Sequence, residues 1–241
     1  MISEVEMISI KQVLRSIGLK TFSETCNFEN IYGLEKEKQV LMMALKAEKP
    51  CHVLLVGPPG IGKTELVLSI YNANRSKAYF TYGGHSTKAG MVNQLFHDRP
   101  RILVVDELET MSAHDQVSLL GLCENGILAE TKITKTRQTQ MNAWVFATSN
   151  CTKKILPPLL SRFIVLNLKR PPREEFIDIG KRMLIEKEEI DPTIALYIAS
   201  QVYDKKKNAD LRDVIKIARA SNGEAKKINL LIDIMSDGQS K

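Results

Sequence analysis

The segment His52-Val-Leu-Leu-Val-Gly-Pro-Pro-Gly-Ile-Gly-Lys-Thr64 carries the pattern that decides the fold of this chain of 241 residues. It opens with an apolar run of strand length, and residues 57–64 then satisfy the spacing G-x-x-x-x-G-K-[ST]. A helical repeat of apolar residues follows over 63–74. A strand, a glycine-rich turn and a helix in this order predict a loop whose backbone N–H groups and helix N-terminus bind phosphate groups.

Two side chains at the end of this loop have the chemistry that nucleotide phosphates require. Lys63 offers a positive charge to the β- and γ-phosphates, and the Thr64 hydroxyl can complete the ligand shell of Mg²⁺. A plain glycine turn at a strand end would not need lysine and threonine in these places. We therefore expect ATP and Mg²⁺ as ligands. The loop residues expected to contact them are Gly57, Pro58, Pro59, Gly60, Ile61, Gly62, Lys63, Thr64 and Glu65.

A second apolar run, residues 102–105, is followed by two acids, Asp106 and Glu107. If this strand lies beside the strand of the phosphate loop, Asp106 reaches the metal from the carboxyl end of the sheet. Glu107 can then polarise the water that attacks the nucleotide. Paired acids after a strand also serve as helix caps, but the phosphate loop about forty residues upstream favours a metal ligand and a catalytic base.

Apolar runs and helical patterns alternate through the first two thirds of the chain. Strands are expected at 52–56, 78–82, 101–105, 143–148 and, more weakly, 163–168, and helices at 8–18, 34–47, 63–74, 87–97 and 113–124. Strands without polar alternation are buried on both faces, which predicts a parallel sheet with helices on either side. The fold class is therefore α/β, a P-loop NTPase sheet.

The pattern changes after Arg170-Pro-Pro172, beyond which only helices are expected. Their ranges are 173–188, 192–203, 209–220 and 225–235. We divide the chain into an N-terminal helical extension, 1–24, a nucleotide-binding α/β domain, 25–170, and a small all-helical lid domain, 171–241.

Composition narrows the setting of the protein. No run approaches the ~18 to 20 unbroken apolar residues of a membrane span, and the acidic N-terminus differs from the basic start of a signal peptide. The four cysteines form no Cys-x-x-Cys pair, which argues against a zinc site and fits reduced thiols. We expect a cytoplasmic protein without membrane partners. The net charge of +6 suits a polyanionic partner but is also common in proteins without one.

Together these motifs make the sequence similar to the AAA+ ATPases from about Phe28 to Arg219. Phe28-Glu-Asn-Ile-Tyr-Gly33 resembles the segment of that family that packs on adenine. The resemblance implies that Ile31 and Tyr32 line the base pocket. Val145-Phe-Ala-Thr-Ser-Asn150 resembles sensor 1, which implies Asn150, with Thr148 as second choice, as the polar residue near the γ-phosphate.

Two further segments resemble the arginine motifs of the same family. Leu159-Leu-Ser-Arg-Phe163 is similar to the arginine-finger segment, in which Arg162 would reach the nucleotide of a neighbouring subunit. Asp210-Leu-Arg-Asp-Val-Ile215 resembles sensor 2, which implies that Arg212 reports the state of the nucleotide to the lid. An arginine that acts across a subunit boundary implies a ring, and we expect a hexamer.

Within the AAA+ proteins, three blocks resemble the RuvB family of Holliday-junction branch-migration motors. They are Thr87 to Phe96, Leu103-Val-Val-Asp-Glu-Leu-Glu-Thr-Met111 and Leu159 to Phe163. RuvB chains continue into a winged-helix DNA-binding domain, whereas this sequence ends at Lys241. We therefore expect a partner protein to supply DNA affinity.

Residues 126–140 alternate polar and β-branched residues around a basic tip, which predicts a hairpin. Related AAA+ groups carry a hairpin before sensor 1 that faces the pore, and the resemblance implies DNA phosphate contacts by Lys132, Lys135 and Arg137. A solvated hairpin without a partner is the alternative.

The combined expectation is a ring-forming, Mg²⁺-dependent ATP hydrolase that acts as a DNA motor or helicase of RuvB-like type. The alternatives are a protein-remodelling or assembly ATPase and a clamp-loader-like switch that loads another factor.

Overall fold

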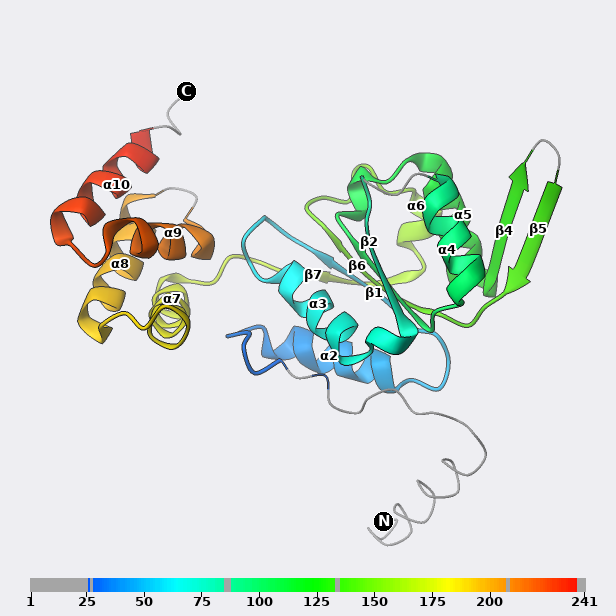
Figure 1. The fold of residues 1–241 in the computed structure, drawn as a ribbon, viewed down its shortest axis with the longest axis horizontal. Coiled ribbons are helices and arrows are strands. Elements are labelled where there is room, and N and C mark those ends of the chain that lie inside the picture. Colours follow the sequence, from blue (N-terminus) through cyan, green and yellow to red (C-terminus); the bar gives the residue numbers. More distant parts are fainter. Residues whose placement is uncertain (1–25, 27, 85–87, 133–134, 207–208, 238–241) are drawn as a thin grey trace, which may run out of the picture.

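The structure is a computed structural model, and it describes residues 26, 28–84, 88–132, 135–206 and 209–237 (Figure 1). The helix expected at 8–18 lies outside these residues. Two units are visible, an α/β unit around one sheet and a helical unit at its side (Figure 1). Among the described residues, none of the helices has the length and apolar character needed to span a membrane.

A five-stranded parallel sheet forms the centre of the α/β unit, with the order β2-β3-β6-β1-β7. Its strands are β1 (His52–Val56), β2 (Ala78–Tyr82), β3 (Ile102–Asp106), β6 (Trp144–Ser149) and β7 (Phe163–Asn167). Every residue of β1, β3 and β6 is buried. The predicted α/β class is therefore confirmed. Where a strand of this sheet begins or ends at another residue than expected, the difference is one residue.

Helices cover both faces of the sheet because alternate residues of each strand point to opposite sides. Leu55 packs with Leu41 of α2 (Glu35–Lys46) and Leu66 of α3 (Lys63–Ala73). Leu54 packs on the other face with Leu95 of α4 (Lys88–Asp98) and Leu119 of α5 (Ala113–Asn125). Each such leucine stabilises the fold by roughly 1.5–3 kcal/mol when fully buried. The result is a three-layer unit whose sheet is dry on both sides.

Three short helical elements were not expected from the sequence. They are η1 (Arg75–Lys77), η2 (Leu108–Thr110) and α6 (Pro157–Leu160). None of them spans two full turns, so apolar periodicity has too few residues to reveal them. The turn η2 directly follows β3 and matters for the site described below.

The expected hairpin is present as β4 (Ile127–Lys132) and β5 (Lys135–Gln140), an antiparallel pair separate from the main sheet. Leu128 is buried beside α5, and the Met141 N–H donates to the Gly126 carbonyl at the base (2.7 Å). The hairpin extends from the end of the α/β unit opposite the helical unit (Figure 1).

The helical unit has a hydrophobic core of its own. It contains α7 (Arg173–Glu188), α8 (Pro192–Lys205), α9 (Leu211–Ser221) and α10 (Ala225–Asp237). Phe176, Leu184, Ile198, Val214 and Ile228 meet in this core. Asp191 caps α8 by accepting the Thr193 N–H (2.8 Å), as the Asp-Pro pair predicts. We refer to this unit, α7 to α10, as the lid.

Candidate active site

The phosphate loop, residues 57–62, leaves the carboxyl end of β1 and enters α3 at Lys63. The Gly57 N–H donates to the Ser149 carbonyl (3.1 Å), which fixes the start of the loop to β6. Gly60 and Gly62 have φ values of 77° and 90°, a region that side chains with a Cβ rarely adopt. The glycines therefore allow the backbone turn that the sequence pattern requires.

Lys63 is buried inside this loop, with 6% of its surface exposed. Its ammonium donates to the carbonyls of Gly57 and Pro58 (2.7 Å each) and to Oδ1 of Asn150 (3.0 Å). Burial lowers the pKa of Lys63, and the negative charge of Glu109 is the strongest influence in the opposite direction. The structure thus brings together two residues, Lys63 and Asn150, that are far apart in the sequence.

The two expected metal ligands are in direct contact. Oγ1 of Thr64 donates to Oδ1 of Asp106 (3.0 Å). Thr148, our second choice for the sensor, is buried and also donates from its hydroxyl to Asp106. A hydroxyl and a carboxylate at the end of the loop are oxygen donors of the kind that Mg²⁺ prefers, so these residues fit the ion.

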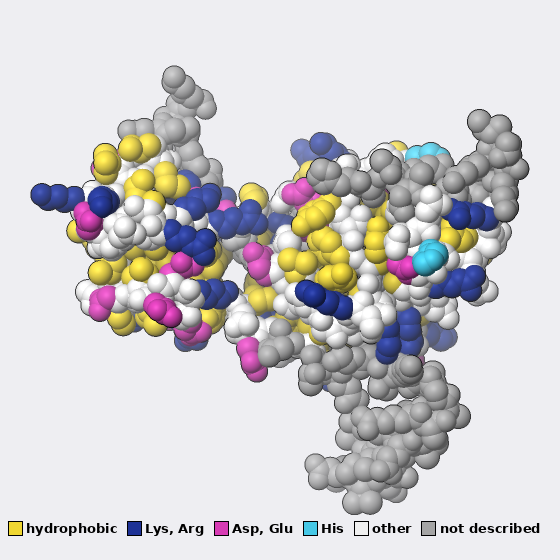
Figure 2. All heavy atoms as spheres, viewed as in Figure 1, with side chains coloured by type: hydrophobic (Ala, Val, Ile, Leu, Met, Phe, Trp, Pro, Cys, Tyr) yellow, Lys and Arg dark blue, Asp and Glu magenta, His cyan; other side chains and the backbone are white. Residues whose placement is uncertain are grey.

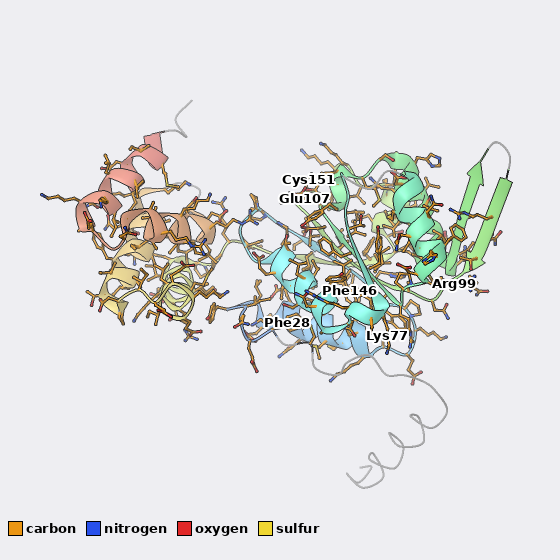
Figure 3. All side chains as sticks on the ribbon, in the orientation of Figure 1. Phe28, Lys77, Arg99, Glu107, Phe146 and Cys151 are labelled. Atoms are coloured by element: carbon orange, nitrogen blue, oxygen red, sulfur yellow. The ribbon has the colours of Figure 1, made fainter. Side chains whose placement is uncertain are left out.

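Glu107 is held by its backbone, while its side chain is exposed. Its φ of 55° is left-handed, and its N–H donates to Oγ1 of Thr148 (3.0 Å). The Thr110 hydroxyl donates to the Glu107 carbonyl (2.7 Å). Glu107 lies at the same end of the sheet as Cys151, which follows β6 (Figure 3). The carboxylate therefore stands at the carboxyl edge of the sheet, where the phosphate loop also lies.

A third acid, Glu109, belongs to the site and was not expected. It is 8% exposed and lies in η2. Its carboxylate accepts hydrogen bonds from the backbone N–H (2.9 Å) and the side-chain Nδ2 (2.8 Å) of Asn150. The signal in the sequence was a further acid two positions after Glu107, but only the fold shows that it meets the end of β6.

A pocket next to the loop joins three parts of the chain. Its walls are the segment before α2, the phosphate loop, and helices α7 and α9 of the lid, and its lining includes Asn30, Ile31, Tyr32, Leu34, Gly60, Ile61, Gly62, Glu65, Ile179, Met183, Lys187, Leu211, Arg212 and Ile215. The expected base-pocket residues Ile31 and Tyr32 both line it. The Tyr32 hydroxyl donates to Glu186 of α7, and the Lys38 ammonium donates to the Ile31 carbonyl (2.6 Å). This segment is therefore fastened to both units.

The lid reaches the phosphate loop through the start of α9. Asp210 caps this helix by accepting the Arg212 N–H (2.7 Å). Its carboxylate also lies against Gly60, so closely that a Cβ at that position would be 2.0 Å away. The side chain of Arg212 is exposed and lines the pocket, and its charge lowers the pKa of Lys63. Asp210 was not among the expected site residues.

Arg162 does not belong to this pocket within the described part of the chain. Its guanidinium donates to Glu124 of α5 (2.5 Å), and the arginine side chain is 39% exposed. The expected finger therefore points along the surface near α5 and α6.

The three basic residues expected to contact DNA differ in how they are held. Arg137 lies 4.2 Å from the centre of the Phe96 ring and donates to Asn93, so it packs on α4. Lys132 and Lys135 pair at the tip of the hairpin, but their side chains lie outside what the structure describes. Basic side chains are spread over the visible face of both units rather than gathered in one patch (Figure 2).

Comparisons with known proteins show which family the chain resembles. Residues 53–170, which run from β1 to the end of the α/β unit, match the model of the ATPase family associated with various cellular activities (AAA). This range is therefore an AAA domain. The matched range contains the phosphate loop, Asp106, Glu107 and Asn150.

Three relatives illustrate the similarity of this AAA+ ATPase. The Holliday junction branch migration complex subunit RuvB of Fusobacterium nucleatum is 30% identical over 132 residues, which cover 53% of this chain and 39% of that protein. RuvB of Mycoplasma genitalium is 24% identical and covers 78% of this chain and 72% of that protein. Lon protease of Clostridium beijerinckii is 29% identical and covers 73% of this chain, but this chain spans only 26% of its length.

A solved structure has the same fold. The RuvB Holliday junction branch migration motor of Thermotoga maritima superposes with a TM-score of 0.64 at 20% identity, covering 88% of this chain and 73% of that one. The fold predicted from the sequence, including the helical unit after the sheet, is thereby confirmed.

Proposed function

We propose that this AAA+ ATPase hydrolyses ATP with Mg²⁺ at the phosphate loop and works as a ring-forming motor on DNA. The observation that carries the hydrolytic part is the meeting of Lys63, the Thr64–Asp106 pair and the lid around one loop. Bound Mg²⁺, held by Thr64 and Asp106, would neutralise charge on the phosphate oxygens.

The protein's own side chains then divide the remaining work. Lys63 binds the β- and γ-phosphates by its charge. Glu107 accepts a hydrogen bond from the attacking water and takes its proton as the water oxygen bonds to the γ-phosphorus in line with the leaving oxygen of ADP. Asn150 contacts the γ-phosphate, and Arg212 contacts the phosphates from the lid. The apolar part of the pocket, with Ile31 and Tyr32, accepts the base.

The division of the chain follows from this assignment. We assign nucleotide binding to residues 25–170 and a lid function to 171–241, with 1–24 as an N-terminal extension. The separate cores of the sheet and of α7 to α10 support this division. The meeting of Asp210 with Gly60 supports a lid that responds to the loop.

The proposal of a ring depends on the position of Arg162. Its exposed position beside Glu124, away from the pocket lining, supports action on the nucleotide of a neighbouring subunit. A closed ring, a hexamer in our proposal, gives every subunit such a neighbour.

Action on DNA is supported by the similarity to RuvB over 78% of the chain and by the basic hairpin. Lys132 and Lys135 at the tip are the proposed phosphate contacts. Arg137 packs on α4, so it also fixes the orientation of the hairpin. A DNA-binding partner protein would supply further affinity.

The test is ATP hydrolysis by the wild-type chain, Lys63→Ala and Glu107→Gln, each with and without a DNA duplex or four-way junction. We expect Lys63→Ala to lose nucleotide binding and Glu107→Gln to bind ATP but turn over about 100-fold or more slowly. DNA should stimulate the wild type, and added salt should weaken this effect because phosphate contacts release counterions. Normal turnover by Glu107→Gln contradicts the assigned base, and absence of any salt-sensitive DNA effect contradicts the DNA motor.

A protein-remodelling ATPase is the second candidate, favoured by the similarity to Lon protease over 73% of the chain. It predicts stimulation of hydrolysis by an unfolded polypeptide such as casein and none by DNA. The same assay with both additives separates the two.

A further inference from the structure

Three acids follow β3, and the proposed mechanism uses only Asp106 and Glu107. Glu109 is buried and makes all its described hydrogen bonds to the end of β6. Its Oε1 accepts from the Asn150 N–H (2.9 Å) and from Nδ2 of Asn150 (2.8 Å), and its Oε2 accepts from the Ser149 hydroxyl (2.8 Å). A buried carboxylate with three donors at the end of β6 fixes the positions of the groups that donate to it.

The geometry that it holds is the orientation of the Asn150 amide. A carboxylate only accepts hydrogen bonds and an ammonium only donates them. The side facing Glu109 must therefore be the NH₂ of Asn150, and the side facing Lys63 must be its oxygen, Oδ1, 3.0 Å from Nζ. Glu109, Asn150 and Lys63 form one chain of hydrogen bonds in which the Asn150 amide can take only one orientation.

The same turn also carries Glu107. In η2 the Thr110 N–H donates to the Glu107 carbonyl (2.9 Å), so Glu107 and Glu109 belong to one short hydrogen-bonded turn. A shift of this turn would move the proposed base and the Asn150 amide together.

We propose that Glu109 is a positioning residue for ATP hydrolysis, which holds Asn150 oriented between Lys63 and the γ-phosphate. The inference rests on the proposed hydrolytic function. Glu109 orients Asn150 by hydrogen bonds, whereas it reaches Lys63 only by its charge, which opposes the lowering of the lysine pKa by burial.

The experiment is a double-mutant cycle of Glu109→Ala and Asn150→Ala. Two quantities are measured for each variant: kcat for ATP, and the ratio of equilibrium affinities for a non-hydrolysable triphosphate and for ADP. We expect each single change to lower both quantities about tenfold, since a hydrogen bond to a charged group is lost. The double variant should be no worse than the worse single one, because both changes remove the same contact. Effects that multiply in the double variant overturn the proposal.

Conservative variants separate positioning from stability. Glu109→Gln keeps an oxygen for Asn150, and its NH₂ can donate to the Ser149 oxygen, whose own proton is within reach of the Cys151 carbonyl (2.6 Å). It should keep both quantities within about threefold of the wild type. Glu109→Asp is one methylene shorter and should behave like Glu109→Ala. If Glu109→Gln is as impaired as Glu109→Ala, the hydrogen-bond role is wrong.

Asp115 provides a matched control. It is a buried acid that accepts from the Ser112 hydroxyl (2.6 Å) at the start of α5 and has no described contact with Asn150. Asp115→Ala should lower the melting temperature, and its effects should multiply with those of Asn150→Ala. A wild-type chain that does not hydrolyse ATP would contradict the proposed function itself, whereas multiplying effects in an active chain contradict only the role of Glu109.

Discussion

Replacing Gly60 by alanine tests whether the lid contacts the phosphate loop. Gly60 has φ of +77°, and a Cβ on it would lie 2.0 Å from the carboxylate atoms of Asp210. Asp210 in turn caps α9 through the Arg212 N–H. A single methyl group therefore strains the loop and displaces the start of a lid helix.

The expected cost has two parts. A residue with a Cβ pays about 1–2 kcal/mol for a left-handed conformation. Asp210 must also move by more than about 1 Å to reach van der Waals distance, and the loss of its capping bond costs about 1 kcal/mol. Together these lower the free energy of unfolding by about 2–3 kcal/mol, which corresponds to a fall in Tm of about 4–12 °C in a chain of this size.

Two comparisons isolate the lid contact. Gly62 has φ of +90°, but a Cβ there would meet only Leu34 at 3.4 Å, so Gly62→Ala should cost the backbone strain alone. Gly60→Ala in an Asp210→Ala background should likewise cost about 1 kcal/mol less than in the wild type, since the cap is already lost. Thermal unfolding is followed by circular dichroism and by the fluorescence of Trp144, the single tryptophan. An equal cost of Gly60→Ala in both backgrounds refutes the contact.

Two further predictions concern the sheet and the ring. His52 is buried, accepts the Val145 N–H at Nδ1 (3.1 Å) and contacts the Cys123 carbonyl at Nε2 (3.1 Å), and burial lowers its pKa below the usual 6.5. The unfolded chain therefore binds a proton at higher pH than the folded chain does, so the free energy of unfolding should fall as the pH drops below about 6.5, and it should fall less in His52→Gln. Equal denaturation midpoints of the wild type at about pH 7.5 and about pH 5 contradict this. For the ring, mixtures of Arg162→Ala with Lys63→Ala subunits should regain ATPase activity that neither has alone, because an arginine finger is worth about a thousandfold or more in kcat. Inactive mixtures of co-assembled subunits rule out action across the boundary.

The parts of the fold that the sequence predicts are those with local causes. The run from His52 to Val56 is uniformly apolar and bounded by a glycine turn, and it forms a strand with those bounds. The strand Ala78–Tyr82 and the helix α7 also have the bounds that their patterns predict. The helix expected at 209–220 instead begins at Leu211, because the Asp210 side chain accepts the Arg212 N–H and so ends the preceding loop.

The parts of the site that the sequence did not predict depend on contacts between distant segments. Glu109 meets Asn150, Asp210 meets Gly60, and Arg162 meets Glu124, and each pair is joined only by the folded chain. A motif identifies groups whose spacing is fixed by a strand and its turn, as in Lys63 and Thr64. It does not identify a carboxylate whose partner lies on the neighbouring strand.

The hydrogen bonds of Lys63 have a consequence for how nucleotide binding is transmitted. An ammonium has three N–H donors, and here they point to the carbonyls of Gly57 and Pro58 and to Oδ1 of Asn150. Lys63 must therefore release at least one partner to donate to a phosphate. If the loop carbonyls are released, the loop that touches Asp210 is free to shift, and the start of α9 in the lid shifts with it. If Asn150 is released instead, the turn that contains Glu107 and Glu109 shifts. Since Glu109 fixes the amide of Asn150 from the other side, removing Glu109 should shift this release toward Asn150 and weaken the signal to the lid.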